Sequence, residues 1–289
     1  FYGSPEAAAP SSSASQQWTI PVCITRQGQE PRCELMREPT LRIPTGGGPA
    51  FINAQSRGYY FSEYRPDAVL ALGKNAGALK APERVTLVGD EWRMIRAGRH
   101  DIGTYLDLAG VMAADDTPWV IDDVAARVGA VATSVADENQ RGAYKAWIRA
   151  RFGPVLESLG LPGKASDADG IQGRRATLLM LLGDTADDTA VQQRARTLAL
   201  GYLDDRTSVP PNVVGAFPRP GAAGGDQGQY DRYMAELTTS KWNPEEYYRF
   251  FNALAWFRDP ALVTRTLEFA GSPEVRTQDA PSLIGLLLA

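Results

Sequence analysis

The spacing of apolar residues along the chain changes close to residue 65. In segment 18–24 every second residue is apolar on one face, which predicts a half-buried strand. Pro21 makes this an edge strand or an irregular one, because proline has no N–H to donate to a sheet ladder. Residues 32–36 and 41–43 are predicted to form two further strands. The first part of the chain is therefore expected to be all β and antiparallel.

A β-hairpin is predicted at the end of this β part. Two short runs of strand-forming residues, 50–53 and 59–61, flank the loop 54–58, which ends in glycine. Near the start, the Pro/Ser/Ala-rich stretch 4–17 has too little apolar surface to order itself and is predicted to be a flexible loop. Together these features predict a partial β domain over residues 1–65.

From residue 66 onward the apolar residues recur at helical spacing. Val85, Val88, Trp92 and Ile95 fall three or four positions apart, and Gly98 follows where a helix would end. The same spacing recurs in segments 105–112, 121–135, 144–159 and 191–202. About ten helices joined by short connections favour a stacked antiparallel array over a single bundle. The predicted fold class is mainly α, with an α-helical superhelix of the HEAT or armadillo kind over residues 66–289.

Four helix starts are marked by a capping side chain that directly precedes a proline. Proline is favoured at the first helical position because its missing N–H would have no partner there in any case. The four pairs are Thr117-Pro118, Asn243-Pro244, Asp259-Pro260 and Ser272-Pro273. Each is expected to begin a helix.

The composition limits the classes of partner. The chain has 289 residues, of which 44% are hydrophobic and 22% charged, as in ordinary globular proteins. With 30 Lys and Arg against 34 Asp and Glu, the net charge of −4 gives no basic field for a nucleic acid. The longest apolar runs, 176–182 and 283–289, are far shorter than the roughly 20 residues that a membrane helix needs. We expect neither a nucleic-acid partner nor a membrane span in this chain.

The two cysteines are placed symmetrically about a glycine. Cys23 and Cys33 each lie five residues from Gly28, so a hairpin that turns at Gly28 puts them opposite each other. Opposed residues at a non-hydrogen-bonded site are close enough for a disulfide. A structural disulfide between Cys23 and Cys33 is predicted, and with it a periplasmic or secreted protein. The alternative is two reduced thiols in a cytoplasmic protein.

No group of residues in the sequence predicts a reaction centre. A hydrolytic zinc site needs imidazole ligands, but His100 is the only histidine, and we interpret it as a solvated or helix-terminal residue. Adjacent carboxylates recur at 115–116, 122–123, 187–188 and 204–205, and we interpret most of them as helix caps or solvated helix ends. We therefore predict no catalytic, cofactor-binding or metal-binding residue in this chain.

An aromatic stretch at residues 242–257 has two interpretations. Seven of its residues are Trp, Tyr or Phe, and they could line a binding groove. Apolar stripes at helical spacing more often face a neighbouring helix, so we interpret the stretch mainly as core.

Four stretches carry a family resemblance that covers nearly the whole chain. Residues 18–22 are similar to a W-x-[IV]-P strand, and residues 53–60 to an N-x-x-x-x-G-[FY]-Y hairpin. Residues 90–98 are similar to a D-x-[FW]-x-L-x-R-A-G helix, and residues 259–279 follow in the matching order. In this order and spacing they resemble the carboxy-terminal half of the zinc aminopeptidases related to aminopeptidase N, the puromycin-sensitive aminopeptidase and the endoplasmic-reticulum aminopeptidases.

The resemblance implies that the chain is one part of a longer enzyme. In such enzymes a small β-sandwich follows the zinc-binding catalytic domain, and a large helical superhelix follows the sandwich. The catalytic domain, with its H-E-x-x-H helix, would lie upstream, and residues 1–2 would end a strand that begins there. The apolar helix expected at 282–289 has no polar cap, so the helical domain is expected to continue beyond it. Phe61 departs from the family, which commonly has Arg there, and this puts the ion pair of that Arg in doubt.

The function expected from the resemblance is that of a non-catalytic region. The whole enzyme would remove amino-terminal residues from peptides, with zinc held in the missing catalytic domain, and the helical domain would enclose the peptide chamber. The partners implied are the chain's own upstream catalytic domain and the peptide substrates of the full enzyme. This chain alone is expected to be inactive. The alternative is a free-standing helical-repeat module that binds a peptide or a protein.

Overall fold

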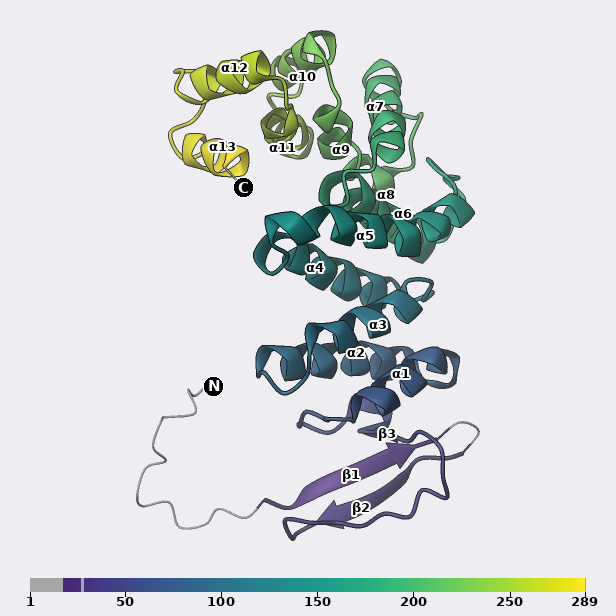
Figure 1. Cartoon of the computed structure of the whole chain (residues 1–289). Coiled ribbons are helices and arrows are strands. Elements are labelled where there is room, and N and C mark those ends of the chain that lie inside the picture. Colours follow the sequence, from purple (N-terminus) through teal and green to yellow (C-terminus); the bar gives the residue numbers. More distant parts are fainter. Residues whose placement is uncertain (1–17, 27–28, 289) are drawn as a thin grey trace. The chain divides into compact units, whose positions relative to one another are not determined.

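The computed structural model describes residues 18–26 and 29–288, and it confirms a mainly α fold with a small antiparallel sheet (Figure 1). The chain forms two compact units, and the boundary between them falls after Val124, within helix α4 (Pro118–Ser134). The flexible loop predicted at 4–17 and the strand end predicted at 1–2 lie outside the described residues.

A three-stranded antiparallel sheet begins the first unit. Its strands are β1 (Ile20–Thr25), β2 (Arg32–Met36) and β3 (Phe51–Ile52), in the spatial order β2-β1-β3. Cys23 lies directly opposite Cys33 in the β1–β2 register, and a disulfide joins the two residues. The predicted cross-strand bridge is therefore present, whereas the predicted turn centre at Gly28 lies outside the described part of the chain.

The predicted hairpin between residues 50–53 and 59–61 is wrong. Strand β3 pairs with β1 instead, and the N–H of Asn53 donates to the carbonyl of Cys23 at 2.8 Å. Asn53 then turns the chain with a φ of 77°, and its side chain bonds the backbone of Gly58 at both the N–H (2.6 Å) and the carbonyl (3.0 Å). This closed loop leaves residues 59–61 outside any strand.

The strand predicted at residues 41–43 is also absent from the described structure, where these residues have no regular secondary structure. Pro39 and Pro44 flank the segment, and neither can donate a ladder hydrogen bond. Strand composition alone was therefore not enough to add a fourth strand to the sheet.

Helices α1 (Pro66–Lys74), α2 (Ala81–Arg96) and α3 (Ile102–Met112) complete most of the first unit, with short 3₁₀ turns at Ala54–Ser56 and Ala76–Ala78. Helices α1 and α2 both pack against α3. The approach at Gly73 is close, since a Cβ there would lie 2.7 Å from a methyl carbon of Leu108. Buried Leu87 and Leu108 form part of the core between these helices.

All regular secondary structure among the described residues of the second unit is helical. Helix α9 packs against α7 and α11, α10 packs against α11, and α12 packs against α13 (Figure 1). A π-helical turn at Leu181–Thr185 continues α6, and a 3₁₀ turn at Leu254–Trp256 continues α11. The helices are α5 (Glu138–Leu159), α6 (Asp169–Met180), α7 (Thr189–Asp204), α8 (Pro211–Val214), α9 (Pro218–Ala223), α10 (Gln227–Thr239), α11 (Pro244–Ala253), α12 (Pro260–Ala270) and α13 (Ala280–Leu287).

Three of the four predicted proline starts are confirmed. Helices α4, α11 and α12 begin at Pro118, Pro244 and Pro260. The fourth prediction is wrong, because Ser272 and Pro273 begin a turn-rich connection, and α13 starts only at Ala280. The carbonyl of Arg276 accepts bonds from two backbone N–H groups in this connection. The connection therefore has its own hydrogen bonding and does not extend the helix.

Candidate functional site

The aromatic stretch 242–257 divides between core and cavity. Phe250, Phe251 and Phe257 are buried, as the core interpretation predicts. Tyr247 and Tyr248, on the first turns of α11, are only half-buried and line a cavity. The stretch is therefore core in part, and whether its two cavity-lining tyrosines bind a ligand stays a prediction.

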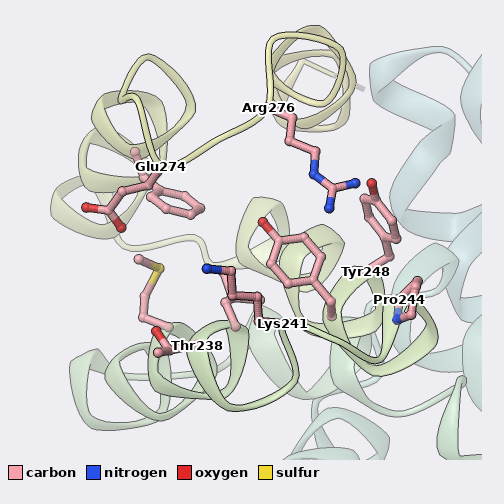
Figure 2. Close-up of a pocket in the computed structure, with 10 residues that line it drawn as sticks. Thr238, Lys241, Pro244, Tyr248, Glu274 and Arg276 are labelled. Carbon is pink, nitrogen blue, oxygen red and sulfur yellow. The ribbon is translucent and has the colours of Figure 1, made fainter.

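This aromatic cavity has a volume of about 310 Å³ and lies among α10, α11, α12 and the connection between α12 and α13 (Figure 2). We use the name aromatic cavity for the space lined by Met234, Leu237, Thr238, Lys241, Pro244, Tyr247, Tyr248, Phe269, Glu274 and Arg276. Ligand pockets in proteins start at about 300 Å³, so this cavity suits a small ligand.

The walls of the aromatic cavity are held by ring contacts and one buried carboxylate. Tyr247 stacks on Phe251 with ring centres 5.5 Å apart, and Phe251 meets Phe269 edge-on at 6.2 Å. The hydroxyl of Tyr248 donates to the carboxylate of buried Asp279, with distances of 3.2 and 3.0 Å to its two oxygens. These contacts fix α11 against the α12–α13 connection, so the lining is built before any ligand arrives.

Three charged side chains line the aromatic cavity: Lys241, Glu274 and Arg276. Within the described residues, no ion pair is formed by Lys241, Glu274 or Arg276, although most neighbouring Arg side chains are paired. Lys241 instead places its ammonium 5.5 Å from the ring centre of Trp242. Burial raises the pKa of Tyr247, and the positive charge of Arg276 opposes that rise. The cavity thus offers two cations and one anion to a ligand.

A second hollow adjoins the aromatic cavity across α11. It is lined by Gly215, Pro244, Glu245, Tyr248, Arg249 and Asn252, so it shares Pro244 and Tyr248 with the first. Its charges are already paired, since Arg249 binds both Glu245 (2.8 Å) and Glu246. Of these two hollows, the aromatic cavity is therefore the one whose charged lining residues form no ion pair with other described residues.

In the first unit, the family-like stretches form a structural junction. Buried Asp90 on α2 accepts the N–H of Ser62 at 2.8 Å, and burial raises the pKa of the Asp90 carboxyl. Arg93 lies 3.5 Å from Asp90 and 4.3 Å above the ring of Phe61. Phe61, which departs from the family pattern, thus stacks against the guanidinium of Arg93 on α2. These stretches connect the β part to the first helices.

His100 lies at the same junction, just after α2, and its side chain is 6% exposed. Its Nδ1 is 2.9 Å from one carboxylate oxygen of Glu91, and its Nε2 is 3.7 Å from Glu63. The helix-terminal position agrees with our interpretation, but the side chain is not solvated. Burial raises the pKa of Glu91, which the hydrogen bond from His100 opposes.

The acidic pairs also have structural roles. Asp188 caps α7 by accepting the N–H groups of Ala190 and Val191, and Asp205 accepts the N–H of Thr207. Among the described residues, no three His, Cys, Asp or Glu side chains are grouped so that they could hold a metal ion. A zinc ion therefore does not fit the donor groups described here. No helix in the described ranges is both long and apolar enough to cross a membrane.

Sequence reasoning missed Lys241, Glu274 and Arg276 as members of one site. The signal available was limited to the family-like stretch 259–279, which contains two of them, and the aromatic stretch that follows Lys241. Their meeting depends on how α12 returns over α10 and α11, and no local pattern encodes that.

Comparison with known proteins finds relatives that are named as aminopeptidases. Aminopeptidase 2 of Candida albicans is 24% identical over 199 residues, which cover 68% of this chain and 22% of the relative. Aminopeptidase M1-A of Oryza sativa subsp. japonica is 25% identical over 244 residues, 81% of this chain and 27% of the relative. Aminopeptidase M1-D of the same plant is 23% identical over 237 residues, which cover 79% of this chain and 27% of the relative.

The chain thus spans about a quarter of the length of the curated relatives it matches. A family model, described as the ERAP1-like C-terminal domain, matches residues 50–289. That range contains both the junction at Asp90 and the aromatic cavity. The chain belongs to the family of ERAP1-like C-terminal domains.

Proposed function

We propose that this chain is the non-catalytic C-terminal region of a zinc-dependent aminopeptidase that removes amino-terminal residues from peptides. The observation that carries the proposal is the family match over residues 50–289, together with three relatives that are named as aminopeptidases. The catalytic domain and its zinc would be supplied by the rest of the polypeptide. No step of the reaction is assigned to the residues of this chain.

The role of the chain in that enzyme would be architectural. We propose that residues 1–65 belong to a β-sandwich and that residues 66–289 form a helical domain that encloses the peptide chamber. Three hydrogen bonds support the architectural role, because they tie the end of the β part to α2: Ser62 N–H to Asp90, Gln55 N–H to Glu83, and the Thr86 hydroxyl to Ser56. Such contacts would hold the first helices in a fixed position against the β part.

An oxidising compartment, periplasmic or extracellular, is proposed for the whole protein. The support is the disulfide between Cys23 and Cys33, since persistent disulfides are rare in a reducing cytoplasm. Mass spectrometry of unreduced, alkylated protein from its native compartment tests the proposal. Recovery of one disulfide-linked peptide pair is expected. Two alkylated thiols would contradict the proposal and favour a cytoplasmic protein.

The peptidase proposal is tested with a fluorogenic aminoacyl substrate. The polypeptide encoded by the whole reading frame should hydrolyse it, and a chelator should abolish the turnover. Residues 1–289 alone should give no turnover with or without zinc. An inactive whole polypeptide would contradict the proposed enzyme, and zinc-dependent turnover by residues 1–289 would contradict the architectural role.

A free-standing peptide-binding module is the second candidate, and the adjoining hollows on both sides of Tyr248 favour it. The reading frame distinguishes the two. An H-E-x-x-H stretch with a further Glu upstream favours the enzyme, and a natural start codon close to Phe1 favours the module.

A further inference from the structure

We propose that the aromatic cavity binds a free α-amino acid with an apolar side chain, in its zwitterionic form. The proposed enzyme releases amino acids, so the ligand would be of the same class as its product. Only that connection rests on the proposed function. The binding itself is inferred from the lining of the cavity.

The arrangement of charge in the aromatic cavity argues for a zwitterion. Glu274 lies at one end and Arg276 at the other, with Lys241 between them (Figure 2). None of the three forms an ion pair with another described residue, so a ligand would not have to displace an existing partner. An ammonium group can pair with Glu274, and a carboxylate with Lys241 and Arg276. A zwitterion can pair with Glu274 and with the two cations at once, whereas a ligand of one charge can pair with only one of them.

The apolar lining argues for a hydrophobic or aromatic side chain. Leu237 is buried and Met234 is half-buried on α10, and the rings of Tyr247 and Phe269 lie on α11 and α12. The ring stack that includes Phe251 keeps these walls in place. Aromatic side chains gain from edge-on or offset contacts with such rings beyond the burial of their area.

The size of the aromatic cavity argues for a single amino acid. Its volume of about 310 Å³ lies at the lower end of the range for ligand pockets. The adjoining hollow has paired charges and offers no further free anion or cation for a longer peptide. We therefore take L-phenylalanine as the probe.

The experiment is isothermal titration of L-phenylalanine into the purified protein. Three ligands are compared with it: N-acetyl-L-phenylalanine removes the ammonium, L-phenylalaninamide removes the carboxylate, and glycine removes the side chain. The N-acetyl form and the amide are each expected to bind about three- to tenfold more weakly, as for the loss of one partly exposed charge pair. Glycine should bind about ten- to a hundredfold more weakly, because it lacks the buried aromatic side chain.

Two variants locate the site, each with a matched control. Glu274→Gln and Arg276→Gln should each weaken the binding of L-phenylalanine about three- to tenfold. The controls Glu138→Gln and Arg141→Gln change exposed residues on α5 and should leave binding unchanged. Each variant removes one charge from an exposed side chain, so folding should be retained, and circular dichroism checks this.

Opposite patterns in the two variants make the test specific. Glu274→Gln should abolish the preference for L-phenylalanine over its N-acetyl form, and Arg276→Gln should reduce the preference over its amide. The absence of saturable binding by L-phenylalanine would overturn the proposal. Equal binding of the N-acetyl form by the unchanged protein would also overturn it, in favour of a carboxylate site. Neither result depends on peptidase activity, so both are separable from a failure of the proposed function.

Discussion

Asp184 is the residue whose substitution should change the pH dependence of stability most clearly. It lies in the π-helical turn Leu181–Thr185, and its side chain is 12% exposed. Among the described residues it forms an ion pair with Arg219, at 3.2 Å, and the guanidinium of Arg219 stacks 3.7 Å from the ring centre of Trp256. Burial raises the pKa of the Asp184 carboxyl from 3.8 to about 6, against the opposing charges of Arg219 and Arg258.

The direction of the effect follows from that raised pKa. Below pH 4 the carboxyl is protonated in both the folded and the unfolded chain, so it has no pH-dependent cost. Between pH 4 and 6 the unfolded chain ionises first, and the free energy of unfolding falls as the pH rises. Well above pH 6 the carboxyl is ionised in both states, and the free energy of unfolding falls no further from this group. Because each pH unit is worth about 1.36 kcal/mol, the interval from 3.8 to about 6 corresponds to about 3 kcal/mol.

The variant Asp184→Asn removes this titration and keeps the shape of the side chain. Urea unfolding followed by tryptophan fluorescence at pH 4, 5, 6 and 7 gives the free energy of unfolding of both proteins. The difference, variant minus unchanged protein, should rise by up to about 3 kcal/mol between pH 4 and 7. Any effect of the substitution that does not depend on pH, such as altered packing, cancels from this pH dependence.

Asp107→Asn serves as the control, because Asp107 is exposed on α3. It changes the same chemical group without the burial on which the prediction for Asp184→Asn rests. Parallel pH curves for Asp184→Asn and the unchanged protein would refute the argument from burial, and a difference that falls with pH would mean that the charges of Arg219 and Arg258 outweigh burial.

Three further predictions concern local geometry and are measured by the same unfolding assay. Replacing Cys23 and Cys33 together by Ala should cost about 2 to 3 kcal/mol, because the short loop is no longer closed in the unfolded chain; a reductant should then have no further effect. Asn53→Gly keeps the positive φ but loses two side-chain bonds to the loop, and should cost about 1 to 3 kcal/mol; an unchanged stability would mean that the loop closes without them. Gly221→Ala puts a Cβ 2.9 Å from the backbone of α7 and should cost about 1 to 3 kcal/mol, whereas Gly173→Ala meets nothing within 4 Å and should be neutral or stabilising.

Several features of the protein were determined by the sequence itself, because the interactions that produce them are local. The helix starts at Asn243 and Asp259 depend on side chains that accept N–H groups two or three residues further on, and on a proline already in a helical φ. The disulfide followed from the symmetric spacing of Cys23 and Cys33, because antiparallel strands pair residues at equal distances from the turn.

Only the tertiary structure decided the features that join distant segments. Strand β3 could pair with residues 59–61 or with β1, and the register with β1 was fixed by contacts of Asn53 with the β1 backbone and with its own loop. The aromatic cavity likewise needs Lys241 from the α10–α11 turn as well as Arg276 from the α12–α13 connection. Helical periodicity states which face of a helix is apolar, but not which other segment covers that face. That choice depends on packing between segments far apart in the sequence, and it decided where the cavity and its unpaired charges lie.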